Sequence, residues 1–120
     1  MWPFNLFGQP RKVHIKLRHE RFATANQIRP EDIPMLAEQG YAAVICVRPD
    51  NEQPNQPTFE EIAGEARKRG MKAFYIPVSS VPTVDQAERF KKVMATIDGP
   101  VLGYCRSGTR AAILYSLLER

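Results

Sequence analysis

Apolar and polar positions along this chain alternate between a strand pattern and a helix pattern. Short apolar segments at 13–17, 21–25, 42–47, 72–78 and 101–104 predict five strands. Between and after these segments, apolar residues at helical spacing predict helices at about 30–39, 58–69, 83–97 and from 109 onward. Because the segment 42–47 is apolar throughout, we expect its strand to be covered on both faces, as in a parallel sheet.

Capping residues mark the starts of two of these helices. Thr58 with Glu61, and Thr83 with Gln86, have the spacing of a capping box. The stretch 48–57 contains three prolines and no apolar side chain other than proline, which is typical of a loop. Strands that alternate with helices predict an α/β fold with three layers, in which helices flank a mostly parallel central sheet of four to five strands.

The length of 120 residues predicts one domain with a modest core. We place this domain at 13–120, after an N-terminal tail or packing arm at 1–12 that is too short to span a bilayer and lacks the pattern of a signal peptide. Two cysteines do not make a disulfide framework. Cys46 lies in an apolar segment and is expected to be buried. These features fit a reducing, cytoplasmic location, although the sequence leaves a functional pairing of Cys46 with Cys105 as an alternative.

The net charge of +4 favours anionic substrates. The basic residues are scattered without an aromatic stripe, so the sequence predicts no nucleic-acid partner. His14 and His19 are the two histidines, and neither belongs to a ligand cluster, so we expect no metal and no cofactor. The sequence ends about three helical turns after Arg110, which leaves open a core completed by a second copy in a homo-oligomer.

The strongest chemical signal is the segment 101–114. Its apolar start ends at Cys105, and a short loop that leads to Arg110 then enters a helical pattern. A strand, a loop and a helix N-terminus in this order form an anion-binding site. The positive electrostatic field of the loop amides and the helix N-terminus also favours the thiolate form of a cysteine. We therefore expect Cys105 to be a nucleophile rather than a structural cysteine, and Arg110 to hold an oxyanion with its planar guanidinium.

The residues between Cys105 and Arg110 are candidates for binding the anion or substrate. Gly108 allows the tight backbone turn that a cradle needs. The hydroxyls of Ser107 and Thr109 could bond to the thiolate, and Thr109 could alternatively cap the helix. Arg106 points either to the substrate or to solvent.

The loop Cys-Arg-Ser-Gly-Thr-Arg at 105–110 resembles the active-site loop of rhodanese-type sulfurtransferases. Protein tyrosine and dual-specificity phosphatases have a similar loop, but with five residues between cysteine and arginine, where this chain has four. Tyr104 also stands where the phosphatases usually have a histidine. A shorter loop makes a tighter ring, which suits a single sulfur atom better than a phosphoryl group.

The resemblance extends beyond the loop. Together with the segments 22–27, 28–32, 44–50 and 75–78, the loop resembles the phosphatase-like domain of beta-lactamase-hydrolase-like proteins, over roughly residues 13 to 120. The resemblance implies a fold like that of dual-specificity phosphatases. Some relatives carry this domain fused to a persulfide dioxygenase, which implies a functional link to such an enzyme in sulfide or persulfide metabolism.

The choice between sulfur and phosphate also depends on a general acid, because a phosphatase must protonate its leaving oxygen. By comparison with dual-specificity phosphatases, Ser80 stands where the aspartic acid is expected, which leaves Asp85 and Asp50 as candidates. The sequence therefore predicts a sulfurtransferase that carries sulfane sulfur as a persulfide on Cys105, between a small-molecule donor and a thiol or cyanide acceptor. The alternatives are a phosphatase-like hydrolase with a cysteinyl-phosphate intermediate and a non-catalytic anion-binding module.

Overall fold

The computed structural model describes residues 13–119, and the tail expected at 1–12 lies outside the described residues. The strands are β1 (Lys16–His19), β2 (Phe22–Ala25), β3 (Ala43–Cys46), β4 (Lys72–Tyr75) and β5 (Val101–Tyr104). The helices are α1 (Ile33–Glu38), α2 (Phe59–Lys68), α3 (Val84–Ala95) and α4 (Thr109–Ser116), with short 3-10 turns η1 (Pro30–Asp32) and η2 (Leu117–Glu119). The sheet has the order β1-β2-β5-β3-β4 and is parallel except for β1, which runs antiparallel to β2.

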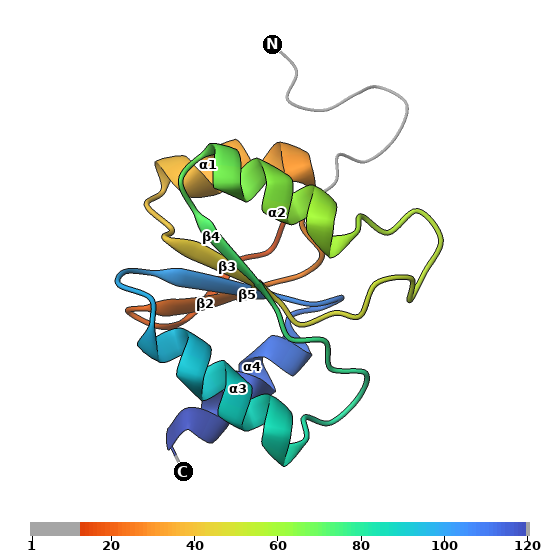
Figure 1. Ribbon diagram of the computed structural model, residues 1–120, viewed down its shortest axis with the longest axis vertical. Helices are drawn as coiled ribbons and strands as arrows, with labels where there is room; N and C mark the ends of the chain where they lie inside the picture. Colours follow the sequence, from red (N-terminus) through yellow and green to blue (C-terminus); the bar gives the residue numbers. More distant parts are fainter. Residues whose placement is uncertain (1–12, 120) are drawn as a thin grey trace.

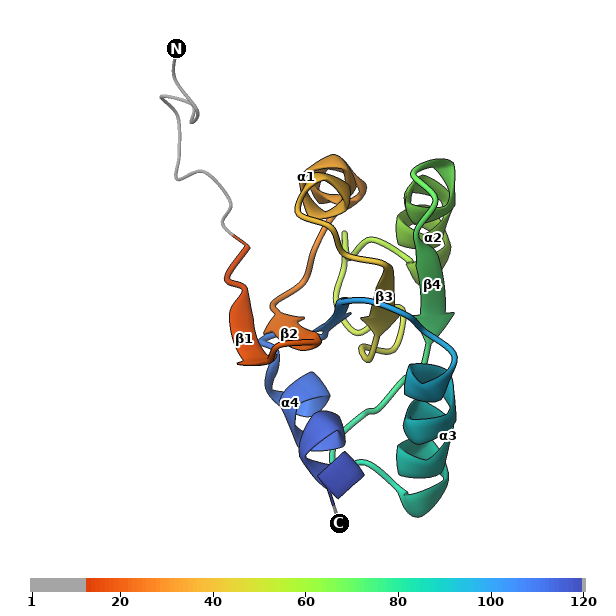
Figure 2. The same cartoon turned by 90° about the vertical axis from the view of Figure 1, so that its left-hand side faces the viewer.

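The sheet lies between two layers of helices, with α1 and α2 on one face and α3 and α4 on the other (Figures 1 and 2). Each interface has its own buried apolar cluster. Val44 and Ile62 belong to the cluster beneath α1 and α2, whereas Ile45 and Phe90 belong to the one beneath α3 and α4. Adjacent residues of β3 thus face opposite layers, as the continuous apolar segment predicts. The predicted three-layer α/β class is confirmed.

Local signals account for the helix starts. Thr58 Oγ1 accepts a hydrogen bond from the Glu61 amide at 3.2 Å, while the Glu61 carboxylate accepts one from the Thr58 amide at 2.8 Å. Thr83 and Gln86 make the same reciprocal pair at 3.1 and 2.9 Å. Both predicted capping boxes are confirmed. No helix within residues 13–119 is long and apolar enough to cross a membrane.

The first strand is the element whose position differs most from the prediction. The sequence places it at 13–17, whereas β1 spans Lys16–His19. All four of its residues are exposed, so burial gives no alternating pattern from which its position could be inferred. Its pairing with β2 also shifts register between Leu17 and His19.

Gly103 in β5 allows close packing beneath the strand that leads to Cys105. A Cβ atom at this position would lie 2.7 Å from Cζ of Phe22 and 3.3 Å from Cβ of Ala111. Phe22 cannot move aside easily, because it stacks on Tyr115 with ring centroids 4.6 Å apart and meets Phe90 edge-on. We expect Gly103→Ala to lower the free energy of unfolding by roughly 1–3 kcal/mol in urea titrations.

Gly64→Ala is the matched control for this substitution. Gly64 lies within α2, and a Cβ atom there would meet nothing within 4 Å. Alanine favours the helix at such a position by roughly 0.5–1 kcal/mol, so this variant should be at least as stable as the parent protein. Equal stability of the two variants would contradict the close contact at Gly103.

Candidate active site

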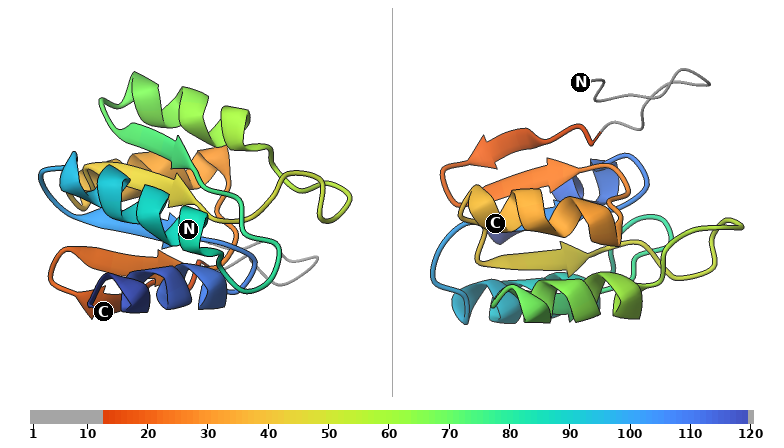
Figure 3. Two further views of the ribbon diagram at one scale, coloured as in Figure 1. Left: turned by 60° about the horizontal axis from the view of Figure 1, so that its bottom comes forward. Right: turned by 90° about the horizontal axis from the view of Figure 1, so that it is seen from above.

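The segments that follow four parallel strands meet at one edge of the sheet. Figure 3 shows the parallel strands pointing toward the same edge, where their loops gather. Gln27 follows β2, Arg48 follows β3, Val78 follows β4 and Cys105 follows β5. This edge is where parallel α/β sheets bind ligands, because loops and helix starts converge there.

The Cys105 loop is anchored to the neighbouring strands and closes on its own sulfur. The Cys105 amide donates to the carbonyl of Ala25 at 3.3 Å, and the Arg106 carbonyl accepts from the Gln27 amide at 3.4 Å. The amide of Gly108 donates to the buried sulfur of Cys105 at 3.0 Å. The loop therefore directs a backbone N–H from the start of α4 at the thiol.

Gly108 has the backbone conformation that the loop requires. Its φ of +96° lies in the left-handed region, and it is the N-cap residue of α4. A Cβ atom there would be in ordinary contact with the Ala25 backbone, at 3.5 Å, so the requirement for glycine is conformational rather than one of space. The alternative role of Thr109 as the N-cap is wrong, because Thr109 is the first residue of the helix.

The two hydroxyl residues of the loop bond to one another. Ser107 Oγ donates to Thr109 Oγ1 at 3.0 Å, and the Thr109 amide donates to Ser107 Oγ at 3.4 Å. Both side chains are exposed, as is Arg106. These three residues form the outer rim of the loop, where they can contact an incoming anion.

Arg110 is held by a carboxylate and by the segment after β4. Its guanidinium donates from one nitrogen to the Val78 carbonyl at 2.7 Å, and it meets both oxygens of Glu52 at 2.7 and 3.1 Å. The hydrogen bond to Glu52 is the main cause of a raised pKa at Arg110. This two-pronged contact with a carboxylate is the geometry that a guanidinium uses for an oxyanion.

Glu52 links Arg110 to a second, buried arginine. Arg48 is 3% exposed, and its Nε lies 2.8 Å from Glu52 Oε1. The other two nitrogens of Arg48 donate to the side-chain oxygens of Gln27, at 3.0 Å, and Gln53, at 2.9 Å. The hydrogen bond from Arg110 is the largest of the causes that lower the pKa of Glu52 from 4.5 to about 2. Glu52 is therefore ionised at neutral pH and cannot donate a proton.

This chain of charges was not predicted from the sequence, which indicated a loop at 48–57 without a role for Arg48 or Glu52. A signal was present, because an arginine directly follows a wholly apolar strand and a glutamate follows four residues later. Sequence spacing alone does not show that the pair reaches Arg110, which lies 58 residues beyond Glu52.

A pocket with a volume of about 490 Å³ opens beside Arg110. It is lined by Glu52, Gln53, Ser79, Ser80, Val81, Arg106, Thr109, Arg110 and Ile113. Ser80 is thus on the wall, as its place in the sequence suggested. Glu52 is the one carboxylate of this lining, and no group of three or more His, Cys, Asp or Glu residues within 13–119 is placed to hold a metal ion.

Neither candidate acid lines this pocket. Asp50 Oδ1 accepts a hydrogen bond from the Phe59 amide at 2.9 Å, at the first residue of α2, and the Asp50 amide donates to the Tyr75 hydroxyl at 2.9 Å. Asp50 therefore ties the loop to α2. Asp85 is exposed in the first turn of α3, where its charge suits the helix dipole. The structure does not bring either aspartate together with Cys105 and Arg110.

Cys46 and Tyr104 face away from Cys105. Both belong to the apolar cluster beneath α1 and α2, whereas Cys105 belongs to the cluster beneath α3 and α4. Cys46 donates its thiol to the Arg48 carbonyl at 3.2 Å, and burial raises its pKa to about 11. Both cysteines are free thiols. Cys46 is buried as expected, and this arrangement does not form a Cys46–Cys105 pair.

The sequence of this chain matches the model of the phosphatase-like domain of beta-lactamase hydrolase-like proteins over residues 14–119. The chain belongs to this family. It is 38% identical to the beta-lactamase hydrolase-like protein of Xylella fastidiosa strain Temecula1 and 41% identical to that of Agrobacterium fabrum, each over 103 residues. Each alignment covers 84% of this chain and 24% of the relative, so the chain spans about a quarter of the length of these family members.

Solved structures place the fold among phosphatases. A Neisseria meningitidis protein described as a "putative phosphatase" aligns with a TM-score of 0.77 and 30% identity, covering 84% of this chain and 72% of that one. A Shewanella putrefaciens protein with the same description has a TM-score of 0.77 at 21% identity, covering 88% and 66%, which shows the shared fold. These relatives support a phosphatase-like, cysteine-based fold. Their descriptions favour the phosphatase alternative over sulfur transfer, which they do not test.

Glu52 should make stability depend on acid pH. Its pKa is lower in the folded protein than the ordinary 4.5, so the unfolded chain binds the proton more readily. The stabilisation is therefore complete above about pH 4.5 and is lost as the pH falls toward about 2. We expect Glu52→Gln to lower the free energy of unfolding at pH 7 by roughly 1–3 kcal/mol.

Urea titrations of the parent protein and Glu52→Gln between pH 7 and pH 3 measure this effect. The difference between the two proteins should be largest at neutral pH and should shrink toward pH 3. A difference that stays constant over this range would show that the carboxylate charge of Glu52 does not stabilise the fold.

Proposed function

We propose that this domain is a sulfurtransferase that carries sulfane sulfur on Cys105. The observation that supports this proposal best concerns the pocket beside Arg110: among the described residues that line it, Glu52 is the one carboxyl group and is held ionised, and Ser80 stands in place of an acid. An alkoxide that leaves a phosphate ester needs a proton, whereas a sulfite or thiolate leaves as a stable anion. The four residues between Cys105 and Arg110 support the same choice.

The proposed reaction has two half-reactions with a covalent intermediate. The Cys105 thiolate attacks the outer sulfur of the donor, a sulfur–sulfur bond forms, and the donor leaves with the electron pair of its broken sulfur–sulfur bond. The acceptor thiolate or cyanide then attacks the outer sulfur of the persulfide, and Cys105 leaves as a thiolate. The Gly108 amide, 3.0 Å from the sulfur, would stabilise its negative charge, and Arg110 would hold the oxyanion of the donor.

This proposal also provides chemistry for a functional link with a persulfide dioxygenase. When the acceptor is a thiol, the product is a persulfide, which is the substrate of such an enzyme. The chain spans about a quarter of its curated relatives, so this link is proposed for the domain and not for a longer protein.

A phosphatase is the second candidate, and the family description and the solved relatives favour it. Cys105 would then form a cysteinyl-phosphate, with the phosphoryl oxygens on the loop amides and Arg110. The absence of an acid in the pocket lining predicts that such an enzyme would hydrolyse esters with good leaving groups far better than those with poor ones. A non-catalytic module is the third candidate and would bind anions without needing the thiol.

One preparation assayed with three substrates separates these candidates. Thiosulfate with cyanide reports sulfur transfer through thiocyanate, whereas nitrophenyl phosphate and phenyl phosphate report hydrolysis with a good and a poor leaving group. We expect thiocyanate formation that saturates with thiosulfate, and only weak hydrolysis of either ester. Efficient hydrolysis of nitrophenyl phosphate without thiocyanate formation would establish the phosphatase, and anion binding without any turnover would establish the module.

A further inference from the structure

A second pocket lies on the other side of Arg106, away from Arg110. Its volume is about 250 Å³, and it is lined by Asn26, Gln27, Arg29, Arg48, Gln53, Pro54, Asn55, Gln56, Pro57 and Arg106. Arg106 and Gln53 also line the pocket beside Arg110, so the two pockets adjoin. We propose that this second pocket binds a remote oxyanion group, a carboxylate or a phosphate, of the small molecule whose reacting atom lies at Cys105.

The charge of the lining supports an anion. Three arginines contribute to this pocket, and no aspartate or glutamate does. Neither Arg29 nor Arg106 has an ion-pair partner within residues 13–119. Arg48 is paired with Glu52, so Arg29 and Arg106 are the two arginines whose charge would attract an anion into the pocket.

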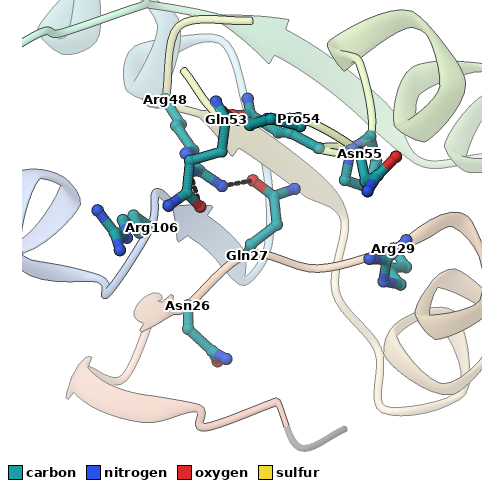
Figure 4. A pocket seen from close by; sticks show the side chains of 10 residues that line it. Asn26, Gln27, Arg29, Arg48, Gln53, Pro54, Asn55 and Arg106 are labelled. Atoms are coloured by element: carbon teal, nitrogen blue, oxygen red, sulfur yellow. Dashed lines mark hydrogen bonds between the residues drawn. The ribbon is translucent and has the colours of Figure 1, made fainter. Parts of the chain in front are cut away.

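Arg48 connects the pocket with the charges behind it. Its contacts with Glu52, Gln27 and Gln53 use three of the five N–H groups that a guanidinium carries. Figure 4 shows Gln27 pointing toward Arg48, with Arg106 and Arg29 on opposite sides of the view. Because Arg48 is 3% exposed and paired with Glu52, it acts on the pocket mainly by holding the side chains of Gln27 and Gln53 in set positions. The remaining side chains are largely amides, which can donate to oxyanion oxygens.

The wall of the pocket is held by its own hydrogen bonds and backbone turns. The segment 48–57 closes on itself through a hydrogen bond from the Gln56 amide group to the Pro49 carbonyl at 2.9 Å. Asn51 and Asn55 have φ values of 66° and 64°, a region that asparagine tolerates better than most residues. These internal contacts limit the ordering that a bound ligand would have to impose on the wall.

The volume limits the ligand to a small group. With about 30 Å³ for each water in the liquid, about 250 Å³ holds a group of a few carboxylates or phosphates. The inference rests on the proposed function only in placing the reacting atom at Cys105. Anion binding itself does not depend on whether that atom is sulfur or phosphorus.

Binding is tested in Cys105→Ser protein, which has no nucleophilic thiol. We titrate it with tricarballylate for carboxylates and with pyrophosphate for phosphates, by calorimetry at low salt. Arg29→Gln, added to this background, should raise the Kd of the favoured ion at least about fivefold, the loss of one charge-assisted hydrogen bond. Arg69→Gln, which removes an exposed charge at the C-terminal end of α2, is the matched control and should leave the Kd unchanged.

Three outcomes are informative. A selective loss in Arg29→Gln with either ion supports the pocket, and the ion that binds more tightly identifies the chemistry. Equal binding by Arg29→Gln and Arg69→Gln, or no saturable binding of either ion, overturns the proposal. Thermal melting of each variant without ligand shows whether it is folded, and Arg29→Lys, which keeps the charge, should bind more tightly than Arg29→Gln.

A kinetic test with the active protein separates this inference from the proposed function. With thiosulfate as donor, Arg29→Gln should lower the ratio of kcat/KM for mercaptosuccinate to that for 2-mercaptoethanol at least about fivefold, whereas Arg69→Gln should not change it. An unchanged ratio in Arg29→Gln overturns the pocket while sulfur transfer stands. Loss of anion binding in Arg29→Gln without sulfur transfer by any protein supports the pocket and overturns the sulfurtransferase.

Discussion

Cys105→Ser is expected to abolish sulfur transfer, with a fall in thiocyanate formation of at least about a thousandfold. The serine hydroxyl is a much weaker nucleophile than a thiolate, and it cannot form a persulfide. The structure supports Cys105 as the reacting thiol because the Gly108 amide donates to its sulfur at 3.0 Å and Arg110 lies in the first turn of α4, directly after the loop. Initial rates with thiosulfate and cyanide measure the effect.

Cys46→Ala is the control for this substitution. Cys46 is buried with a pKa raised to about 11, so its removal should leave sulfur transfer within about twofold of the parent protein. Both thiols are buried, but the Gly108 amide donates to the Cys105 sulfur whereas the pKa of Cys46 is raised, so iodoacetamide labelling followed by peptide mass spectrometry should modify Cys105 well before Cys46. Equal labelling of both cysteines, or full activity of Cys105→Ser, would contradict the role of Cys105.

Arg110→Lys is expected to lower kcat/KM for thiosulfate between about tenfold and a hundredfold, which corresponds to roughly 1.4–2.8 kcal/mol in the barrier. Lysine keeps the positive charge but loses the planar fork that bonds to two oxygens at once. Arg110 uses this fork on Glu52, with contacts of 2.7 and 3.1 Å. The donor oxyanion would take over these contacts.

Two further variants show whether Arg110 acts on the donor or only on the fold. Arg69→Lys makes the same exchange at an exposed site and should retain full activity. Glu52→Gln removes the charge of the ion pair but leaves Arg110 in place, so it should bind anionic donors at least as well as the parent protein. If Glu52→Gln loses as much kcat/KM as Arg110→Lys, the ion pair itself is what matters, and Arg110 supports structure.

The sequence predicted the layers of the fold because burial leaves a direct pattern in it. Three kinds of signal involve only residues that are close in the sequence: the apolar segment at β3, the capping boxes at Thr58 and Thr83, and the helical spacing of α3. The edge strand β1 lacked such a pattern, since it is exposed along its whole length. Its position follows from its hairpin pairing with β2, in which the register shifts between Leu17 and His19.

The site was only partly predictable, because contacts between distant segments leave no pattern among neighbouring residues. The residues from Cys105 to Arg110 are contiguous, so their motif could be read directly from the sequence. Glu52 contacts Arg110 across 58 residues of sequence, and the second pocket, which Arg29, Arg48 and Arg106 line, combines the segments after β2, β3 and β5. Neither arrangement can be inferred until the order of the strands in the sheet is known. Asp50 looked like a candidate acid in the sequence, but it bonds to the first amide of α2.

The most direct test of the proposed function is the mass of the intact protein after incubation with thiosulfate and removal of excess donor. The proposal predicts a gain of one sulfur atom, located by peptide mapping on Cys105, present in Cys46→Ala, absent in Cys105→Ser, and removed by cyanide. A mass that never changes with thiosulfate, together with a transient cysteinyl-phosphate on Cys105 from an aryl phosphate, would contradict sulfur transfer and establish the phosphatase.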